Sequence, residues 1–298
     1  MIIKMKKLVC AAAALLLALA CLTAGAEEAW LTPIADAGEA LLFDTHNVTL
    51  NGRLTFTLDG ERFKTADCIY IQDGFNSLWD VRLTTPRGDH DQDTGFTVTA
   101  NEGDIYVTEY YWPGLYREGS DDEQNTLVRR SLYLDQLVKL CRGLVPQLET
   151  GFADRVTLTQ DDEGQLTSLT LSGEDIPEAA TGLMNIGAQL LIKRYFGQEL
   201  DDAGGYEPYF GMADYFSPTA ALLNCTRSFT PERIDLAVRL DSEGKITLME
   251  GDINLNLDAG QDGMHKLEIS FSVAVSKYGG SEVAPFDPDG LEIWDGTW

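Results

Sequence analysis

Hydrophobic and polar residues alternate with a period of two along much of the chain, which is the pattern of a β-strand with one buried and one exposed face. In residues 48–58 every second residue from Val48 onward is apolar except Gly52, and the residues between them are polar. The Asp59-Gly60 dipeptide that follows is typical of a hairpin turn. The first third of the chain is therefore predicted to be a meander of about five antiparallel strands. The other four strands are residues 62–71, 78–84, 95–100 and 104–112.

Other segments repeat their apolar residues with the spacing of an α-helix. These predicted helices are residues 28–44, 126–145 and 175–196. Pro146 is expected to end the second helix because proline cannot donate a helical hydrogen bond. Asp175 is expected to cap the third helix, with Glu178 as its capping-box partner. A short hairpin, made of residues 155–160 and 166–171, is predicted between these two helices.

Alternation returns near the C-terminus and predicts three more strands. They are residues 234–240, 245–257 and 265–276. The apolar phase of the second strand changes near Met249-Glu250, which predicts a β-bulge there. The tail, residues 279–298, is rich in Gly, Pro and Asp and is expected to be irregular.

The fold class follows from the need to cover the apolar faces of these strands, because a sheet buries such a face against a second layer. The amphipathic helices can supply that layer. We therefore predict an α+β fold, in which a curved antiparallel, half-barrel-like sheet carries helices on its concave face. No shift in composition divides the chain, so residues 27–298 are expected to form a single domain with a helical and hairpin insertion around 126–226.

The N-terminus has the three parts of a secretory signal peptide: a basic start, a short apolar core and a small-residue cleavage motif. Lys4, Lys6 and Lys7 precede an apolar run of fifteen residues, and cleavage is predicted after Ala26. The run is shorter than the roughly 20 residues of a membrane span. Attachment of a lipid to Cys21 is a less favoured alternative. We expect residues 1–26 to be removed and the mature chain, without a transmembrane segment, to be secreted or held in the cell envelope.

The composition describes an acidic globular protein. The 298 residues carry a formal net charge of −26, and 44% of them are hydrophobic. Such a surface repels phosphate backbones and anionic lipid headgroups, so nucleic-acid binding and electrostatic membrane docking are disfavoured. Cleavage after Ala26 would leave three scattered cysteines, Cys68, Cys141 and Cys225, without a C-x-x-C motif. Burial as small hydrophobic residues is the preferred interpretation, and the sequence leaves open whether any two form a disulfide.

The chain lacks the common catalytic signatures, including G-x-S-x-G, H-E-x-x-H and the glycine-rich phosphate loops. No enzyme activity, cofactor or metal site is therefore predicted. The alternating carboxylates of residues 89–95 resemble the start of a calcium loop, but the twelfth position is Ala100 in place of the glutamate such a loop needs. We interpret this segment as a solvated acidic turn.

The order of elements resembles the lipoprotein-carrier superfamily of the LolA and LppX type, with a signal peptide, a short helix, a meander, a helical insertion and returning strands. The resemblance extends over most of residues 28–276 and concerns patterning, since no residue motif carries it. In that superfamily, acyl chains lie between the curved sheet and its helices. The resemblance thus implies a role in binding a hydrophobic ligand.

Face assignment gives the residues that would line such a site. Strand and helix residues are predicted to face one another across the interior, and the aromatic-rich loop 206–216 is a candidate lid or recognition surface. The predicted ligand-binding residues are Phe56, Leu58, Val98, Leu183, Leu190, Leu191, Leu255, Phe271, Val273, Tyr209 and Phe210. The same side chains equally suit a filled core.

Two functions of different classes remain open at this stage. The preferred one is a secreted or envelope-associated binding protein that holds a lipid, a lipopeptide or another apolar ligand between sheet and helices. The alternative is an extracellular module without a small ligand, which binds an envelope protein or a cell-wall polymer through its acidic surface and the aromatic loop.

Overall fold

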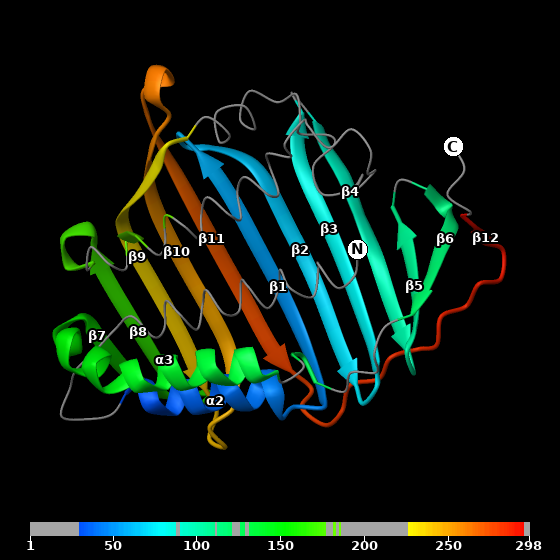
Figure 1. The fold of residues 1–298 in the computed structure, drawn as a ribbon, viewed down its shortest axis with the longest axis horizontal. Coiled ribbons are helices and arrows are strands. Elements are labelled where there is room, and N and C mark those ends of the chain that lie inside the picture. Colours follow the sequence, from blue (N-terminus) through cyan, green and yellow to red (C-terminus); the bar gives the residue numbers. More distant parts are fainter. Residues whose placement is uncertain are drawn as a thin grey trace.

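One twelve-stranded sheet dominates the computed structural model of the chain (Figure 1). The structure describes residues 30–87, 90–110, 112–120, 126–128, 131–176, 181–182, 185 and 226–294. The strands lie in the order β12-β6-β5-β4-β3-β2-β1-β11-β10-β9-β8-β7. Every neighbouring pair is antiparallel except β12 and β6, which are parallel. An open, curved and mostly antiparallel sheet is thus confirmed, whereas helices packed along its concave face are not shown by the described residues.

The strands follow the predicted periodicity closely. In chain order they are β1 (Asn47–Leu58), β2 (Glu61–Asp73), β3 (Asn76–Arg87), β4 (His90–Asn101), β5 (Asp104–Glu109), β6 (Trp112–Ser120), β7 (Val156–Asp161), β8 (Gly164–Ser172), β9 (Ser228–Leu240), β10 (Ile246–Asp258), β11 (Met264–Ser276) and β12 (Glu292–Ile293). The described helices are α2 (Leu31–Phe43) and α3 (Leu132–Gly151), with short 3₁₀ turns η1 (Ala153–Arg155), η2 (Gly173–Asp175) and η3 (Gly260–Asp262).

The first meander has six strands where five were expected. The stretch predicted as one strand, residues 104–112, turns at Tyr110 and divides into β5 and β6. Strand β4 begins at His90, so the acidic segment is extended and not a turn. Asp93 there pairs with Arg82 of β3, and Asp91 accepts from Arg62 of β2 at 2.9 Å. Cross-strand pairing therefore decides the conformation of this segment.

Two further expectations differ from the structure in their position. Pro146 lies inside α3, which continues to Gly151. The bulge of β10 lies between Ile246 and Leu248, ahead of the predicted place, so Met249 is on the apolar face opposite Val273.

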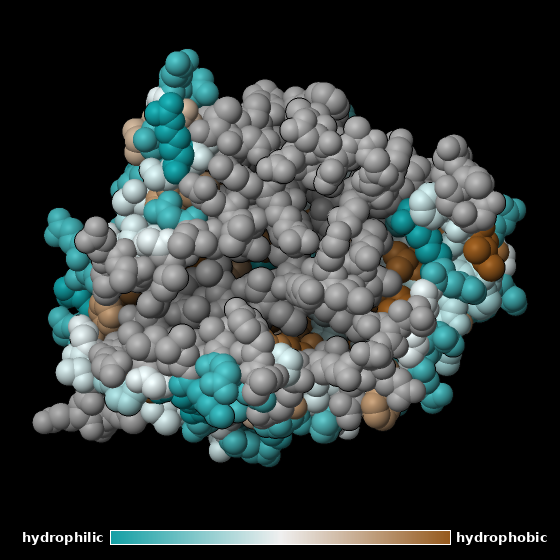
Figure 2. Space-filling model, in the orientation of Figure 1, coloured by the Kyte–Doolittle hydropathy of each residue, from teal (hydrophilic) through white to brown (hydrophobic). Residues whose placement is uncertain are grey.

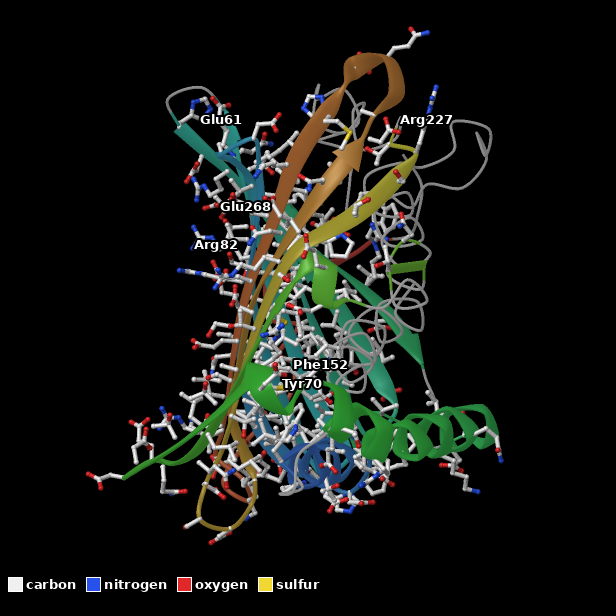
Figure 3. All side chains as sticks on the ribbon, turned by 90° about the vertical axis from the view of Figure 1, so that its left-hand side faces the viewer. Glu61, Tyr70, Arg82, Phe152, Arg227 and Glu268 are labelled. Carbon is white, nitrogen blue, oxygen red and sulfur yellow. The ribbon has the colours of Figure 1, made fainter. Side chains whose placement is uncertain are left out.

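The apolar face of the sheet carries three clusters of buried side chains. The first packs β8–β11 against residues near η1 and η2, the second joins the helices to β1, β9, β10 and β11, and the third lies on β3, β4 and β5. Deeply buried members are Phe229 and Leu257 in the first cluster, Leu31 and Val48 in the second, and Phe96 and Ile105 in the third. Figure 3 shows Tyr70 and Phe152 on one side of the sheet, with Arg82 and Glu268 on the other.

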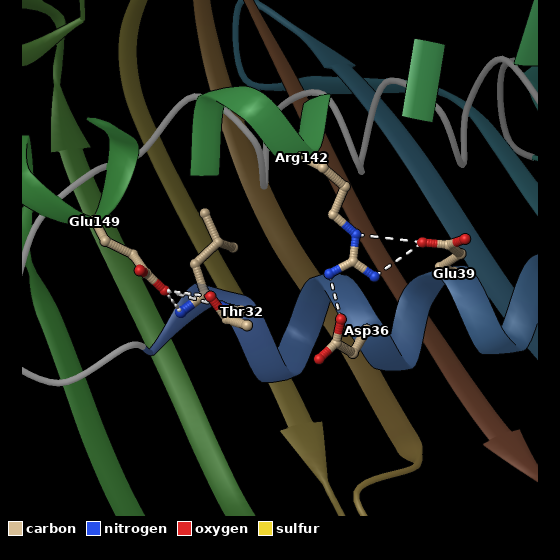
Figure 4. A network of polar contacts seen from close by, with 6 residues as sticks. Thr32, Asp36, Glu39, Arg142 and Glu149 are labelled. Atoms are coloured by element: carbon tan, nitrogen blue, oxygen red, sulfur yellow. Dashed lines mark hydrogen bonds and ion pairs between the residues drawn. The ribbon is translucent and has the colours of Figure 1, made fainter. Parts of the chain in front are cut away.

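Helices α2 and α3 lie together at one end of the sheet, and polar contacts join them (Figure 4). Arg142 of α3 donates to Glu39 of α2 at 2.9 Å and also pairs with Asp36. Glu149 accepts hydrogen bonds from the backbone N–H groups of Leu31 and Thr32, each at 2.9 Å. A carboxylate of α3 therefore caps the N-terminus of α2, where the helix dipole favours negative charge.

The C-terminal tail is irregular, as predicted, but it is held to the sheet by specific contacts. The Asn47 side chain donates to the Ser281 carbonyl at 2.8 Å and accepts from the Ser281 N–H at 2.6 Å. Further along, the Phe286 ring stacks on Tyr106 with centroids 4.4 Å apart. The tail then forms β12, which pairs with β6 at the edge of the sheet.

Several predicted elements lie outside the described residues. These are the signal peptide, the aromatic loop 206–216 and most of the predicted helix 175–196, of which residues 181, 182 and 185 are helical. Asp175 itself ends η2 and forms a capping box with Ser172. None of the described helices is long and apolar enough to cross a membrane.

Candidate functional site

The middle of the apolar face forms a strip of half-buried side chains between the three clusters. Leu54 of β1 lies opposite Phe271 of β11, and Phe56 lies opposite Ile269. Residues directly opposite each other on antiparallel strands share a face and lie about 5 Å apart. These four side chains are partly exposed, unlike the residues that centre the clusters. We call these four residues and Val273 the apolar strip.

A glycine on the neighbouring strand shapes the strip. Gly251 of β10 lies opposite Phe271, and a Cβ atom placed on it would come within 2.5 Å of the phenyl ring. The ring therefore occupies the space that a side chain at position 251 would fill. The alternation of apolar residues in β10 breaks at this glycine, so the sequence did carry a signal for the close approach.

The structure brings some of the predicted ligand-binding residues together. Leu255 belongs to the first cluster, and Leu58 and Phe271 pack against it. Phe56 contacts Phe63, with ring centroids 5.8 Å apart. These residues occupy neighbouring strands on one face, which agrees with the face assignment.

Other predicted lining residues lie apart or outside the described part. Val273 belongs to the strip and also packs against the second cluster, whereas Val98 lies apart in the third cluster, on β4. Five predicted residues fall outside the described residues, so their place relative to the strip stays a prediction. They are Leu183, Leu190, Leu191, Tyr209 and Phe210.

Sequence reasoning missed an ion pair on the same face of the sheet, at β5 and β6. Glu109 has only 7% of its surface exposed, and its Oε1 lies 3.0 Å from Nη2 of Arg117. Neither carboxylate oxygen accepts a hydrogen bond among the described residues. The Trp294 ring, from the end of the tail, covers the guanidinium of Arg117 at 3.5 Å from the ring centroid. The apolar face thus holds one arginine in a cation–π contact beside a buried carboxylate.

Burial controls the protonation of this carboxylate. Desolvation raises the pKa of Glu109 above its ordinary value of 4.5, and the nearby charge of Arg117 offsets part of that rise. A folded chain that binds this proton more tightly than the unfolded chain loses stability as pH rises through the interval between the two pKa values.

The variant Glu109→Gln removes the titrating group but keeps the size and shape of the side chain beside Arg117. The difference in free energy of unfolding, variant minus wild type, is expected to increase as pH rises above 4.5, the ordinary pKa of glutamate, because only the wild type ionises a buried group. Urea unfolding at a series of pH values measures the difference. Glu61→Gln, on an exposed hairpin, controls for the loss of a charge. A Glu109→Gln difference that stays constant with pH contradicts the prediction.

The opposite face of the sheet is polar and carries cross-strand ion pairs. Arg53 pairs with Asp67 at 2.6 Å, and Arg239 pairs with Asp161 at 2.7 Å and with Glu163 at 2.8 Å. A groove of about 390 Å³ crosses β8–β11, and polar or charged side chains form most of its lining. In Figure 2 mostly hydrophilic residues form the projecting β10–β11 hairpin, and a hydrophilic patch lies near α2 and α3.

The described residues offer little for redox or metal chemistry. Among them, no three His, Cys, Asp or Glu side chains are grouped to hold a metal ion. Cys68 is a free thiol, and burial raises its pKa to about 12, so it stays protonated at neutral pH. His265 pairs with Asp59 at 2.6 Å, and this hydrogen bond raises the pKa of the imidazole. That pair joins the β1–β2 turn to β11.

Comparison with known proteins gives two solved structures of interest. No family model and no curated protein matches the chain. A LolA superfamily protein from Nitrosomonas europaea is similar at 11% identity, over 83% of this chain and 93% of that chain, with a TM-score of 0.21. The bifunctional dehydratase-cyclase domain in ambruticin biosynthesis is similar at 13% identity, over 84% and 82% of the two chains, with a TM-score of 0.12. Scores of this size carry no argument about function.

Proposed function

We propose that this chain is a secreted or envelope-associated binding protein without catalytic activity, which holds a lipid or another apolar ligand against the apolar face of its sheet. The observation that carries the proposal is the apolar strip. Its side chains remain half-buried on neighbouring central strands, whereas a filled core would bury them. Neighbouring apolar side chains that stay partly exposed to solvent are typical of a binding site.

The chemistry of the strip favours a long apolar ligand over a compact polar one. The side chains of Leu54, Phe56 and Phe271 offer carbon surface without hydrogen-bond donors or acceptors. Each methylene group that such a surface removes from water contributes about 0.8 kcal/mol. The polar groove on the opposite face has the reverse character, so the apolar face is the preferred site.

The direct experiment is native mass spectrometry of the protein purified from its own envelope. We expect an adduct whose mass, after release by organic solvent, is that of a lipid or lipopeptide. A protein that arrives without an adduct, but with a co-purifying envelope protein or wall polymer, would instead support an extracellular interaction module.

A matched pair of variants tests the site itself. Leu54→Glu places a charge in the strip. Thr55→Glu places the same charge one residue further along β1, on the opposite, polar face of the sheet. Titration with the fluorescent fatty acid cis-parinaric acid measures binding. We expect Leu54→Glu to weaken binding about tenfold or more, because an apolar ligand cannot compensate a buried charge. Equal affinities for the two variants, both shown to be folded by circular dichroism, would place the ligand elsewhere.

A further inference from the structure

The two edges of the sheet differ in how they are protected. Strand β6 contains Pro113, and β12 pairs with its Leu115 and Tyr116. Proline and an added strand are both devices that prevent an edge from pairing with another chain. At the other end of the sheet, β7 pairs with β8 and has no second neighbour among the described strands.

Strand β7 has none of these protective features. Its sequence, VTLTQD, contains no lysine or proline, and its pairing with β8 runs without a bulge. All residues after Val156 are exposed, including Leu158 with 41% of its surface accessible. An exposed strand with β-branched and apolar residues is a template for adding a further strand.

The charges at the two ends of this edge are complementary under a two-fold axis. If two copies of β7 pair antiparallel with Leu158 opposite Leu158, Arg155, the last residue of η1 just before β7, comes near the Asp161 of the other copy. Arg155 already contacts Asp175 at 2.8 Å, and Asp161 contacts Arg239 at 2.7 Å. Both side chains remain accessible to a second copy, because 44% of the Arg155 side chain and 40% of the Asp161 side chain is exposed. A second copy would extend each existing pair into a network.

We propose that β7 is a self-association edge, through which two copies of this chain form a symmetric dimer with one continuous sheet. The two-fold axis passes between the Leu158 residues and is perpendicular to the sheet. Both apolar faces then lie on the same side. The interface is isologous, so each copy contributes the same residues and the assembly closes at two chains.

Cysteine substitution tests the register in the otherwise intact mature protein. Residues directly opposite on antiparallel strands have Cα atoms about 4.5–5.5 Å apart, within the range of a disulfide. Leu158→Cys should therefore form a covalent dimer under mild oxidation. Gln160→Cys is the matched control, because its own copy would lie four residues away, about 13 Å along the strand. We expect Leu158→Cys to cross-link about tenfold faster or more than Gln160→Cys.

A mixture completes the test of register. In the proposed pairing, residue 156 of one copy lies opposite residue 160 of the other, so Val156→Cys mixed with Gln160→Cys should cross-link although neither does so alone. The wild type measures the background from its native cysteines. Equal rates for Leu158→Cys and Gln160→Cys would overturn the register.

Sedimentation velocity of the wild type tests the dimer without any cross-link. A dimer is expected, and Leu158→Lys should convert it to a monomer by placing two positive charges at the axis. Gln160→Lys, which meets no like charge in this register, should stay dimeric. A wild type that remains monomeric up to its solubility limit would overturn the proposal, and this outcome leaves lipid binding untouched.

Discussion

Phe229→Ala is expected to lower the free energy of unfolding by about 3–5 kcal/mol, the usual cost of emptying a buried phenylalanine site. Phe229 has 2% of its surface exposed and lies in the first cluster, opposite Leu257 of β10. The site cannot collapse readily, because the backbone of Phe229 is fixed by both an N–H and a carbonyl bond to the Asn185 side chain. Denaturant unfolding followed by circular dichroism measures the change.

Phe75→Ala provides the comparison for this prediction. Phe75 lies in the turn between β2 and β3 with 47% of its surface exposed. Its removal is expected to change stability by less than about 0.5 kcal/mol. Equal losses of unfolding free energy for Phe229→Ala and Phe75→Ala would contradict tight packing around Phe229 in the first cluster.

Gly164→Ala is expected to cost about 2–4 kcal/mol, because the new methyl group would meet backbone atoms. Gly164 begins β8 with a φ of +127°, and a Cβ atom there would overlap the carbonyl oxygen of Leu240 and lie 2.9 Å from the Cα of Asp241. Neither contact can be relieved by rotating a side chain, so β8 must move away from β9. Thermal or chemical unfolding measures the loss.

Gly60→Ala separates the effect of the contact from the effect of the backbone angle. Gly60 has a φ of +84° in the β1–β2 turn, and a Cβ atom there meets nothing within 4 Å. We expect a cost of about 1 kcal/mol, from the conformational preference alone. Equal losses for the two alanine variants would contradict the close approach at Gly164.

Local periodicity predicted most strands because a two-residue alternation reports one buried face directly. Strand β1, expected over 48–58, spans Asn47–Leu58, and the hairpin expected at 155–171 appears as β7 and β8. The position of the β10 bulge was missed because Met249 is apolar, like Leu248, and so fits either phase. Pro146 was expected to end α3, but the helix continues through it for five further residues.

The pairing of strands could not be predicted in the same way. Nothing in the alternation of β1 indicates that its second neighbour is β11, since the apolar faces of several other strands carry similar aliphatic and aromatic residues. The buried pair of Glu109 and Arg117 was missed for a related reason. The turn at Tyr110 was taken as strand, so β6 and the face of Arg117 were not assigned, and Trp294 arrives from a distant tail.

The central place of β1 has a consequence for the order of folding during synthesis. One neighbour of β1, the strand β2, follows it at once, but the other is β11, and the tail contact between Asn47 and Ser281 spans 234 residues. A growing chain can therefore assemble two half-sheets but cannot join them until its last long strand emerges. High separation of contacting residues slows folding, so we expect the seam between β1 and β11 to close late. A chain interrupted before β11 would leave β1 as an unpaired edge in place of a central strand.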